Sequence, residues 1–549
     1  MIQKPCLVQT PQGFSVSYKE RLLYSKYAPQ KAILKTINEL TILPGTLILC
    51  CSPALFYGLP ELLAKLPENC FVIACEFDKE LFEFSQKVLS DFCEDPRFVF
   101  LSAKEISNLP YYTNSTSQLN IKEFKKLPPI KTLKRVLRID FSAGTQFNTS
   151  AYDDLVETTT NSIATFWKNR LTLTQFGRKY SQNLFKNLKK LPETVPINNY
   201  FNSICKSIVV FGAGESTDEG IKTIKSERNS FYIICADTAM IPLLKNGIIP
   251  DAVFLEEAQN VISKAFIHPK RTDRQIHYFA GLTSIPQLCD FVKPEQVSYF
   301  TTLYTKAIFL DDLAKKNLLP PQNQPFGSVG LTALLYALKF RKNDSVPVFF
   351  YGLDFCYSSG ITHAKGTIAH NQRLCNANRL NPSQNYSAAF VNAFKVNGKD
   401  GKIMFTTKAL YNYSLLLNYF FKNEKNVYDS AKKGLESVFE KRQPAAHDTN
   451  LILNANPTQL IHSYNYTQEF SGKIKLYFEQ EREALTQLRD ILTGKTKIPQ
   501  NDAEELIKKI AGPREYLYLH FPDGQQFSME LSFLKRLRTS IDFFLKVLY

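Results

Sequence analysis

The sequence lacks several features that would place it in familiar classes of protein. Its 11 cysteines include no C-x-x-C pair, so neither a zinc site nor a disulfide framework is indicated. No D-x-D motif occurs, which removes the usual sign of a metal-clamped nucleotide-sugar diphosphate. No apolar run approaches the ~18 residues of a membrane-spanning helix, and the first residues do not resemble a signal peptide. We therefore expect a reduced, cytoplasmic protein with no membrane span.

Arginine-rich tracts are also missing, although the chain is strongly basic. Its 67 Lys and Arg residues outnumber 51 Asp and Glu residues, for a net charge of +16. Such a balance is compatible with an anionic partner, but no nucleic-acid motif accompanies it. We therefore favour a solvated basic surface and expect no nucleic-acid partner.

What the sequence does contain is 549 residues, 44% of them hydrophobic, which is enough for several cores. Strand-like and helix-like segments alternate from Thr46 onward, a pattern typical of an α/β fold with parallel sheets. We predict an N-terminal Rossmann-like α/β domain over residues 1–150 and a helical connector over 151–200. A central, doubly wound nucleotide-binding domain follows over 201–437, and a helical C-terminal region covers 438–549.

The central domain begins with the most informative stretch of the chain. The apolar run Ile208–Phe211 leads into Gly212-Ala213-Gly214-Glu215-Ser216, then a helical segment, a second apolar run and Asp237-Thr238. Glycines let backbone N–H groups approach a phosphate, and an acid at the next strand end can accept from a ribose hydroxyl. The alternative is a sharp turn without a ligand, with Asp237 as a helix N-cap.

Three further segments carry candidate site residues. Ser328 opens a helix whose first N–H groups could hold a phosphate. Asp354 follows a strand, and His363 lies in the loop after it, where it could serve as a general base. For His363 a surface histidine without function is an equal alternative, and for His370, in the same loop, that alternative is favoured. In the N-terminal domain, Glu76 ends a strand where a ribose-binding acid would lie, or is a solvated strand-end acid.

These motifs resemble the motility-associated factor (Maf) family. The resemblance is carried by the segments GAGESTD, ADTAMIPLL, NGIIPD, GSVG, YGLD and THAKG, at residues 212–218, 236–244, 246–251, 327–330, 351–354 and 362–366. Family members commonly read G-A-G-P-S-L-D at the first motif, so Glu215 and Thr217 are departures. The resemblance covers roughly residues 40–437 and is strongest over 203–366.

The resemblance implies a glycosyltransferase that modifies Ser or Thr of flagellin with a nonulosonic acid of the pseudaminic or legionaminic type. The donor would be a CMP-activated sugar, the central domain would be sialyltransferase-like, and no metal or other cofactor would be required. Carried onto this chain, the residues that bind the nucleotide would be Gly212, Gly214, Glu215, Ser216, Asp237, Thr238 and Ser328. Asp354 and His363 would line the reacting centre, with His363 as the candidate base.

Two alternatives remain open at this point. The central domain is also similar to 6-hydroxymethylpterin diphosphokinase (MptE-like) domains, which would bind ATP and Mg²⁺ through carboxylates such as Asp237, Glu256 and Asp354. The departures at Glu215 and Thr217 instead allow a non-catalytic flagellar chaperone or adaptor. Nothing in the sequence indicates the oligomeric state.

Overall fold

The computed structural model describes residues 4–89, 95–107, 127–260, 276–382, 390–445, 465–496, 498–523 and 526–549. The chain divides into two compact units, Met1–Leu173 and Thr174–Tyr549. Helix α5, Thr149–Lys190, runs through this boundary. The predicted helical connector is therefore mostly one long helix, whose C-terminal turns belong to the second unit.

The first unit contains a four-stranded parallel sheet with the strand order β6-β5-β4-β7. Its strands are β4 (Thr46–Cys51), β5 (Phe71–Glu76), β6 (Phe98–Ser102) and β7 (Arg135–Asp140). Its helices are α1 (Lys31–Glu39), α2 (Leu59–Ala64), α3 (Lys79–Val88) and α4 (Ala103–Ile106). A small antiparallel sheet precedes it, made of β1 (Cys6–Thr10), β2 (Gly13–Tyr18) and β3 (Arg21–Leu22). This confirms the predicted Rossmann-like α/β arrangement.

The second unit is built on a nine-stranded sheet in which every neighbouring pair is parallel. Its order is β13-β12-β11-β10-β9-β8-β14-β17-β18. The strands are β8 (Ile208–Phe211), β9 (Tyr232–Ala236), β10 (Ala252–Leu255), β11 (His277–Gly281), β12 (Val297–Thr302), β13 (Gln322–Asn323), β14 (Val348–Tyr351), β17 (Val427–Asp429) and β18 (Glu440–Lys441). The sequence order therefore reverses between β8 and β14, as in a doubly wound sheet.

Helices cover both faces of this sheet, which explains why its central strands are continuous apolar runs rather than alternating ones. Ile208 and Val210 of β8 pack with α10 (Val329–Phe340) in one cluster. Val209 and Phe211 face the other side, in a cluster shared with the next helices. The remaining helices are α6 (Thr217–Ile224), α7 (Asp237–Lys245), α8 (Leu288–Phe291), α9 (Ile308–Lys315), α11 (Ile368–Asn376) and α12 (Lys408–Phe421). A hairpin of β15 (Ala393–Asn397) and β16 (Ile403–Thr407) precedes α12.

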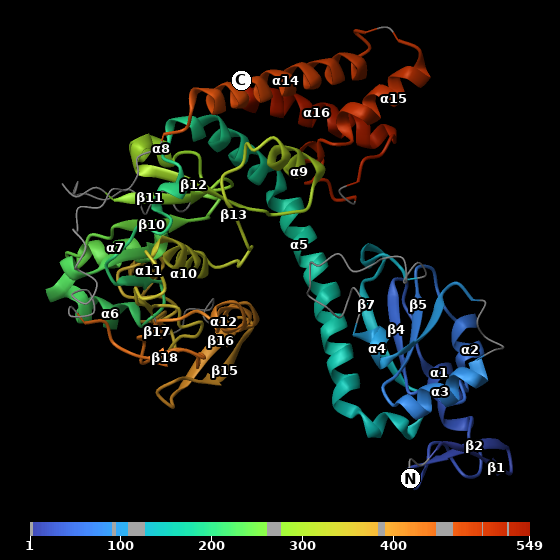
Figure 1. Cartoon of the computed structure of the whole chain (residues 1–549). Coiled ribbons are helices and arrows are strands. Elements are labelled where there is room, and N and C mark those ends of the chain that lie inside the picture. The colour runs from blue at the N-terminus through green and yellow to red at the C-terminus, as the bar shows by residue number, and fades with distance from the viewer. Residues whose placement is uncertain are drawn as a thin grey trace. The chain divides into compact units, whose positions relative to one another are not determined.

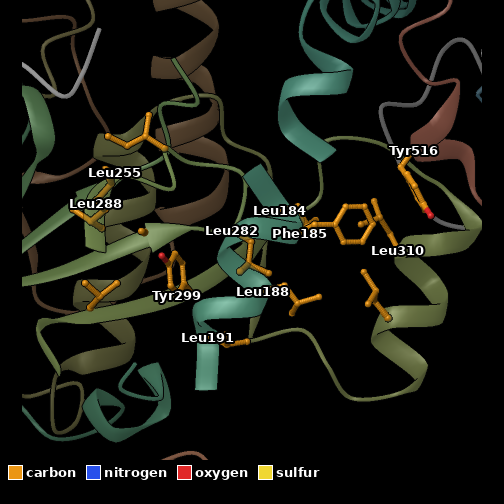
Figure 2. Packing of buried hydrophobic residues seen from close by; sticks show 14 of the residues in the cluster. Leu184, Phe185, Leu188, Leu191, Leu255, Leu282, Leu288, Tyr299, Leu310 and Tyr516 are labelled. Atoms are coloured by element: carbon orange, nitrogen blue, oxygen red, sulfur yellow. The ribbon is translucent and has the colours of Figure 1, made fainter. Parts of the chain in front are cut away.

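The second cluster also contains the end of α5 and the C-terminal helices. Figure 2 shows Leu184, Phe185 and Leu188 of α5 among residues of the sheet region and Tyr516. The C-terminal helices are α14 (Gln468–Leu492), α15 (Gln500–Ala511) and α16 (Leu531–Leu548), seen in orange and red in Figure 1. The predicted amphipathic C-terminal helix is thus buried on its apolar face, while residues 446–464 of the predicted helical region lie outside the described residues.

Across the parts of the chain that the structure describes, no helix combines the length and apolar character needed to cross a bilayer.

Candidate functional site

A cavity of about 260 Å³ opens where the turn after β8 meets the turn after β14. This is the reversal point of the doubly wound sheet, where ligands of such folds bind outside the carboxyl ends of the strands. The lining residues are Gly212, Ala213, Gly214, Ala236, Asp237, Thr238, Gly327, Ser328, Val329, Gly330, Gly352, Leu353, Phe355, Cys356, Tyr357, Thr362, His363, Leu410 and Tyr413. The structure thus brings five predicted residues, Gly212, Gly214, Asp237, Thr238 and Ser328, to one cavity with His363.

The glycines allow the two turns to touch. A Cβ on Gly212 would lie 2.2 Å from the carbonyl oxygen of Gly352, and one on Gly214 would lie 2.5 Å from Asp354 Oδ2. Gly352 itself has φ +71°, a conformation that favours glycine. Close approach of two backbone segments therefore requires glycine here.

Ser216 and Asp354 connect the same two turns through hydrogen bonds. The Ser216 hydroxyl donates to Asp354 Oδ1 (2.5 Å), the Ser216 amide donates to Oδ2 (2.8 Å), and the Gly352 amide donates to the Ser216 hydroxyl (2.7 Å). Burial raises the pKa of Asp354 to about 6, although the Ser216 donors act to lower it. Asp354 is 1% exposed, and neither residue lines the cavity. Against the expectation that Ser216 faces a phosphate and Asp354 the reacting centre, both hold the site from behind.

The amides of the glycine turn were predicted to bind a phosphate, but several of them already donate to acceptors within the protein. The Gly212 amide donates to the Tyr351 carbonyl (2.8 Å) and the Gly214 amide to the Gly352 carbonyl (2.9 Å). With the Ser216 amide also engaged, three of the N–H groups in this turn already have acceptors in the protein. The turn therefore contributes mainly shape to the cavity. Ala213 also lines the cavity and could add one amide, so a phosphate would draw its other donors from elsewhere.

The N-terminus of α10 supplies such donors at the cavity wall. Ser328 is its N-cap, and the Ser328 carbonyl accepts from the amides of Leu331 and Thr332. The first amides of a helix, here those of Val329 and Gly330, have no partner within the helix, and both residues line the cavity. They lie at the positive end of the helix dipole, which favours an anion.

Asp237 and Thr238 lie at the end of β9, on another side of the cavity. The Thr238 amide and hydroxyl both donate to Asp237 Oδ1, at 2.6 and 3.0 Å. Burial raises the pKa of Asp237 to about 6, partly offset by Thr238, and the charges of Glu257 and Glu256 raise it further. Among the residues that the structure describes, Asp237 Oδ2 has no hydrogen-bond partner, so it can accept from a bound hydroxyl.

Glu215 does not line the cavity, contrary to its predicted place among the nucleotide-binding residues. Its carboxylate pairs with Lys433 and accepts from the Ser358 amide at 3.3 Å. Burial acts to raise the pKa of Glu215, but the hydrogen bonds from Lys433 and Ser358 and the charge of Lys433 together lower it. The departure from the family motif at this position is therefore matched by a cationic partner 218 residues along the chain.

His363 lines the cavity, whereas His370 does not. The His363 Nδ1 atom lies 3.1 Å from the Thr362 hydroxyl, and burial together with the positive charge of Arg373 lowers the pKa of His363. The ring is therefore neutral near pH 7 and able to take up a proton. His370 Nδ1 instead accepts from the Gly366 amide at 3.3 Å, near the start of α11.

The sequence reasoning missed the apolar side of the cavity. Phe355, Cys356 and Tyr357 follow β14, and Leu410 and Tyr413 come from α12, more than 50 residues after β14. The first three adjoin the predicted Asp354 and could have been included on that ground. The two α12 residues carried no motif, because only the fold brings their helix to the cavity.

The equivalent crevice of the first unit is built differently. Glu76, at the end of β5, is 1% exposed and accepts from Ser52 (2.7 Å), Tyr152 (2.9 Å) and the Asp78 amide (3.0 Å). Burial raises its pKa to about 7, although these donors act to lower it. A Cβ on Gly144 would lie 2.2 Å from the Ser52 hydroxyl oxygen, so the protein itself fills this space. Glu76 is therefore neither a solvated acid nor open to a ribose.

Few of the described side chains near the cavity are available as metal ligands. In the described part of the chain, no three His, Cys, Asp or Glu side chains gather as a metal-binding group. Glu256, one of the carboxylates considered for Mg²⁺, accepts from Thr302 (2.5 Å) and Thr332 (2.8 Å). Asp354 is held by Ser216, so Asp237 is the carboxylate with an oxygen still available to a ligand.

Comparison with known proteins adds three findings. A family model described as "6-hydroxymethylpterin diphosphokinase MptE-like" matches residues 181–360. An uncharacterized protein of Treponema pallidum (strain Nichols) is 30% identical over 567 aligned positions, which cover 99% of this chain and 95% of that protein. The solved structure of the MAf glycosyltransferase from Magnetospirillum magneticum AMB-1 is similar with a TM-score of 0.52 and 13% identity, over 99% of this chain and 91% of that one. The last match shows a shared fold, and both units take part in it.

Proposed function

Because this chain belongs to the MptE-like, Maf-type family of proteins, we propose that it is a glycosyltransferase that uses a CMP-activated nonulosonic acid. The acceptor in this proposal is a Ser or Thr hydroxyl of flagellin, and the sugar is of the pseudaminic or legionaminic type. The observation that carries the proposal is the cavity itself, which joins an anion-binding helix start, a hydroxyl-accepting carboxylate and a neutral histidine.

The cavity offers a place for each part of CMP. The phosphate would bind at the start of α10, where the amides of Val329 and Gly330 have no acceptor within the helix and Ser328 offers a hydroxyl. The ribose hydroxyls would donate to Asp237. An acid at the end of the second strand has this role in nucleotide-binding folds. Gly212 and Gly214 would shape the floor between these two groups, and Ser216 and Asp354 would act as positioning residues beneath it.

The reaction needs one proton acceptor and stabilisation of one leaving group. The acceptor hydroxyl oxygen forms a bond to the anomeric carbon of the sugar while the bond from that carbon to the CMP phosphate oxygen breaks. His363 would take the hydroxyl proton, because its lowered pKa keeps the ring neutral at pH 7. The start of α10 would stabilise the charge that develops on the departing phosphate.

The description of the matched family model favours a second candidate, a pterin diphosphokinase that transfers pyrophosphate from ATP. That reaction needs carboxylates to hold Mg²⁺ between the phosphates. Glu256 and Asp354 already accept hydrogen bonds from threonine or serine side chains, which leaves Asp237 as the available ligand. We therefore place this candidate second.

A nucleotide panel tests the proposal with one sample of the full chain. CMP, UDP, GDP and ATP, the last with and without Mg²⁺, are titrated by calorimetry against the wild type and the Asp237→Asn variant. We expect CMP to bind most tightly without added metal and D237N to weaken it. Preferential, Mg²⁺-dependent binding of ATP would instead support the diphosphokinase, and no binding of any nucleotide would support a non-catalytic adaptor.

A further inference from the structure

We propose that a ridge of exposed apolar side chains beside the cavity docks the acceptor polypeptide, through an amphipathic helix with acidic flanks. The apolar ridge consists of Phe394 on β15 and Tyr411, Leu415, Tyr419 and Phe420 on α12. The inference rests on the proposed function, because it concerns the protein substrate of the same cavity.

Helix α12 has one side at the cavity and another in solvent. Leu410 and Tyr413 line the cavity. Tyr411, Leu415 and Tyr419 are exposed and follow one another at intervals of four residues, so they form a single stripe about 12 Å long. The stripe and the cavity-lining residues lie on different faces of the same helix. A polypeptide bound on the stripe would therefore be close enough to the cavity for one of its hydroxyl groups to enter the cavity.

The side chains of the apolar ridge are large, exposed and close to one another. Leu415 is 51% exposed and Tyr419 is 70% exposed, although both are apolar or aromatic. The ring centroids of Phe394 and Tyr411 lie 6.0 Å apart and those of Tyr419 and Phe420 5.1 Å apart, so the patch includes both elements. A contiguous apolar patch on a protein surface typically marks a binding site.

The surface is held in place from beneath. The turn of the β15–β16 hairpin is anchored by an ion pair between Lys399 and Asp429, whose side chains are 2% and 0% exposed. Tyr357, at the cavity, exchanges two backbone hydrogen bonds with Phe405 of β16, at 2.8 and 2.9 Å. Figure 1 shows the hairpin beside α12. The apolar ridge is thus a preformed platform that shares its supports with the cavity wall.

The shape and charge of the platform favour a helix with acidic flanks as its occupant. A straight stripe of three side chains matches the apolar face of an amphipathic helix laid alongside. Lys408 and Lys422 are exposed at the two ends of the stripe, three residues before Tyr411 and three after Tyr419, so carboxylates on the partner would be attracted. A second copy of this chain is a poorer fit, because a two-fold contact would bring these lysines toward their own equivalents.

The test measures binding of purified flagellin to the full chain by biolayer interferometry without donor sugar. The variant Leu415→Asp places a charge in the middle of the apolar ridge, and the matched control is Leu476→Asp on α14, where the leucine is 53% exposed. We expect L415D to weaken flagellin binding at least tenfold, while L476D and the affinity for CMP stay at the wild-type values. Melting temperatures of both variants are compared to exclude unfolding.

A second pair of variants tests the charged rim independently of the apolar stripe. Lys422→Glu is expected to weaken flagellin binding several-fold, with Lys475→Glu on α14 as its control. Unchanged flagellin binding by L415D and K422E would overturn the docking surface. A wild-type dimer that L415D converts to a monomer would also overturn it, in favour of self-association. Failure of the wild type to bind CMP would overturn the proposed function. A loss of flagellin binding in L415D would still support the docking surface in that case, because flagellin binding is measured without CMP.

Discussion

Asp237 is the residue whose chemistry most directly couples the cavity to pH. Burial raises its pKa to about 6, so the carboxylate is ionised at pH 7.5 and largely protonated at pH 5. If ribose hydroxyls donate to the ionised form, one pH unit below this pKa reduces the binding-competent fraction about tenfold. The same shift lowers the stability of the folded chain as pH rises from about 4 to 6, because the folded state then holds more protons than the unfolded one.

We therefore expect the Kd of CMP for the wild type to rise when the pH is lowered from 7.5 to 5.0. This rise should be about tenfold larger than the rise measured for Asp237→Asn over the same interval. The variant retains the titration of the CMP phosphate and loses that of the carboxylate, so the difference isolates Asp237. Calorimetric titrations at four pH values provide the measurement. Parallel pH profiles for the two proteins would show that Asp237 does not contact the ligand.

Ser216 is predicted to be a stabilising residue rather than a ligand contact. Ser216→Ala removes the hydroxyl between Gly352 and Asp354 and leaves a buried amide and a carboxylate oxygen without it. We expect a loss of about 1–3 kcal/mol in the free energy of unfolding, measured by urea denaturation. Ser284→Ala is the matched control, since Ser284 is fully buried and its hydroxyl has no hydrogen-bond partner among the described residues. Equal effects of the two substitutions would contradict the assigned role.

At the scale of the elements, the strand-turn-helix unit from β8 to α6 was predictable, and so was the place of its turn at the carboxyl ends of the strands. The apolar run, the two glycines and the following acid define it locally. The donors for a phosphate were not predictable, because the acceptors of the Gly212 and Gly214 amides belong to β14 and its turn, some 140 residues away in sequence. Ser328 was predicted as a site residue from its position before an apolar helix, and in the structure it lines the cavity.

The contact between the two turns makes Gly212 intolerant of a side chain. Gly212→Ala would place a Cβ 2.2 Å from the Gly352 carbonyl oxygen, which is backbone and cannot rotate away. We expect a cost of about 1–3 kcal/mol in unfolding free energy and at least a tenfold weaker affinity for CMP. Gly472→Ala on α14, where no atom of the described part of the chain lies within 4 Å of the added Cβ, should leave CMP binding unchanged and stabilise the helix by up to ~1 kcal/mol. Wild-type CMP affinity in G212A would show that the two turns can separate without consequence.

At the scale of the whole molecule, the sequence indicated an α/β chain with a helical end but not how the helical end is used. Phe185 on α5 is fully buried and its ring lies 4.8 Å from that of Tyr516 and 6.1 Å from that of Phe544. Phe185 is more than 300 positions from both of these partners, and helical periodicity alone reveals neither contact. The C-terminal helices therefore belong to the core of the second unit, which sequence patterns left as a separate region.

Because the C-terminal helices share one core with the sheet, shortening a side chain at the centre of that core should lower the free energy of unfolding strongly. Phe185→Ala should cost about 3–5 kcal/mol in the free energy of unfolding, because it empties a site contacted by three segments. Phe14→Ala in the first unit, where the ring is 47% exposed, should cost far less. Urea denaturation followed by tryptophan and tyrosine fluorescence measures both. A small loss in F185A would show that the C-terminal helices do not depend on this contact.

The proposed transferase activity is tested most directly by the intact mass of flagellin from cells that lack this chain, complemented with the wild type or with His363→Gln. We expect flagellin from the deletion strain to be lighter by whole nonulosonic acid units and the wild type to restore the mass. H363Q should not restore it, although purified H363Q should still bind CMP, because the base is lost and the binding groups remain. A flagellin mass that is the same in all strains would contradict the assignment of this chain as the transferase.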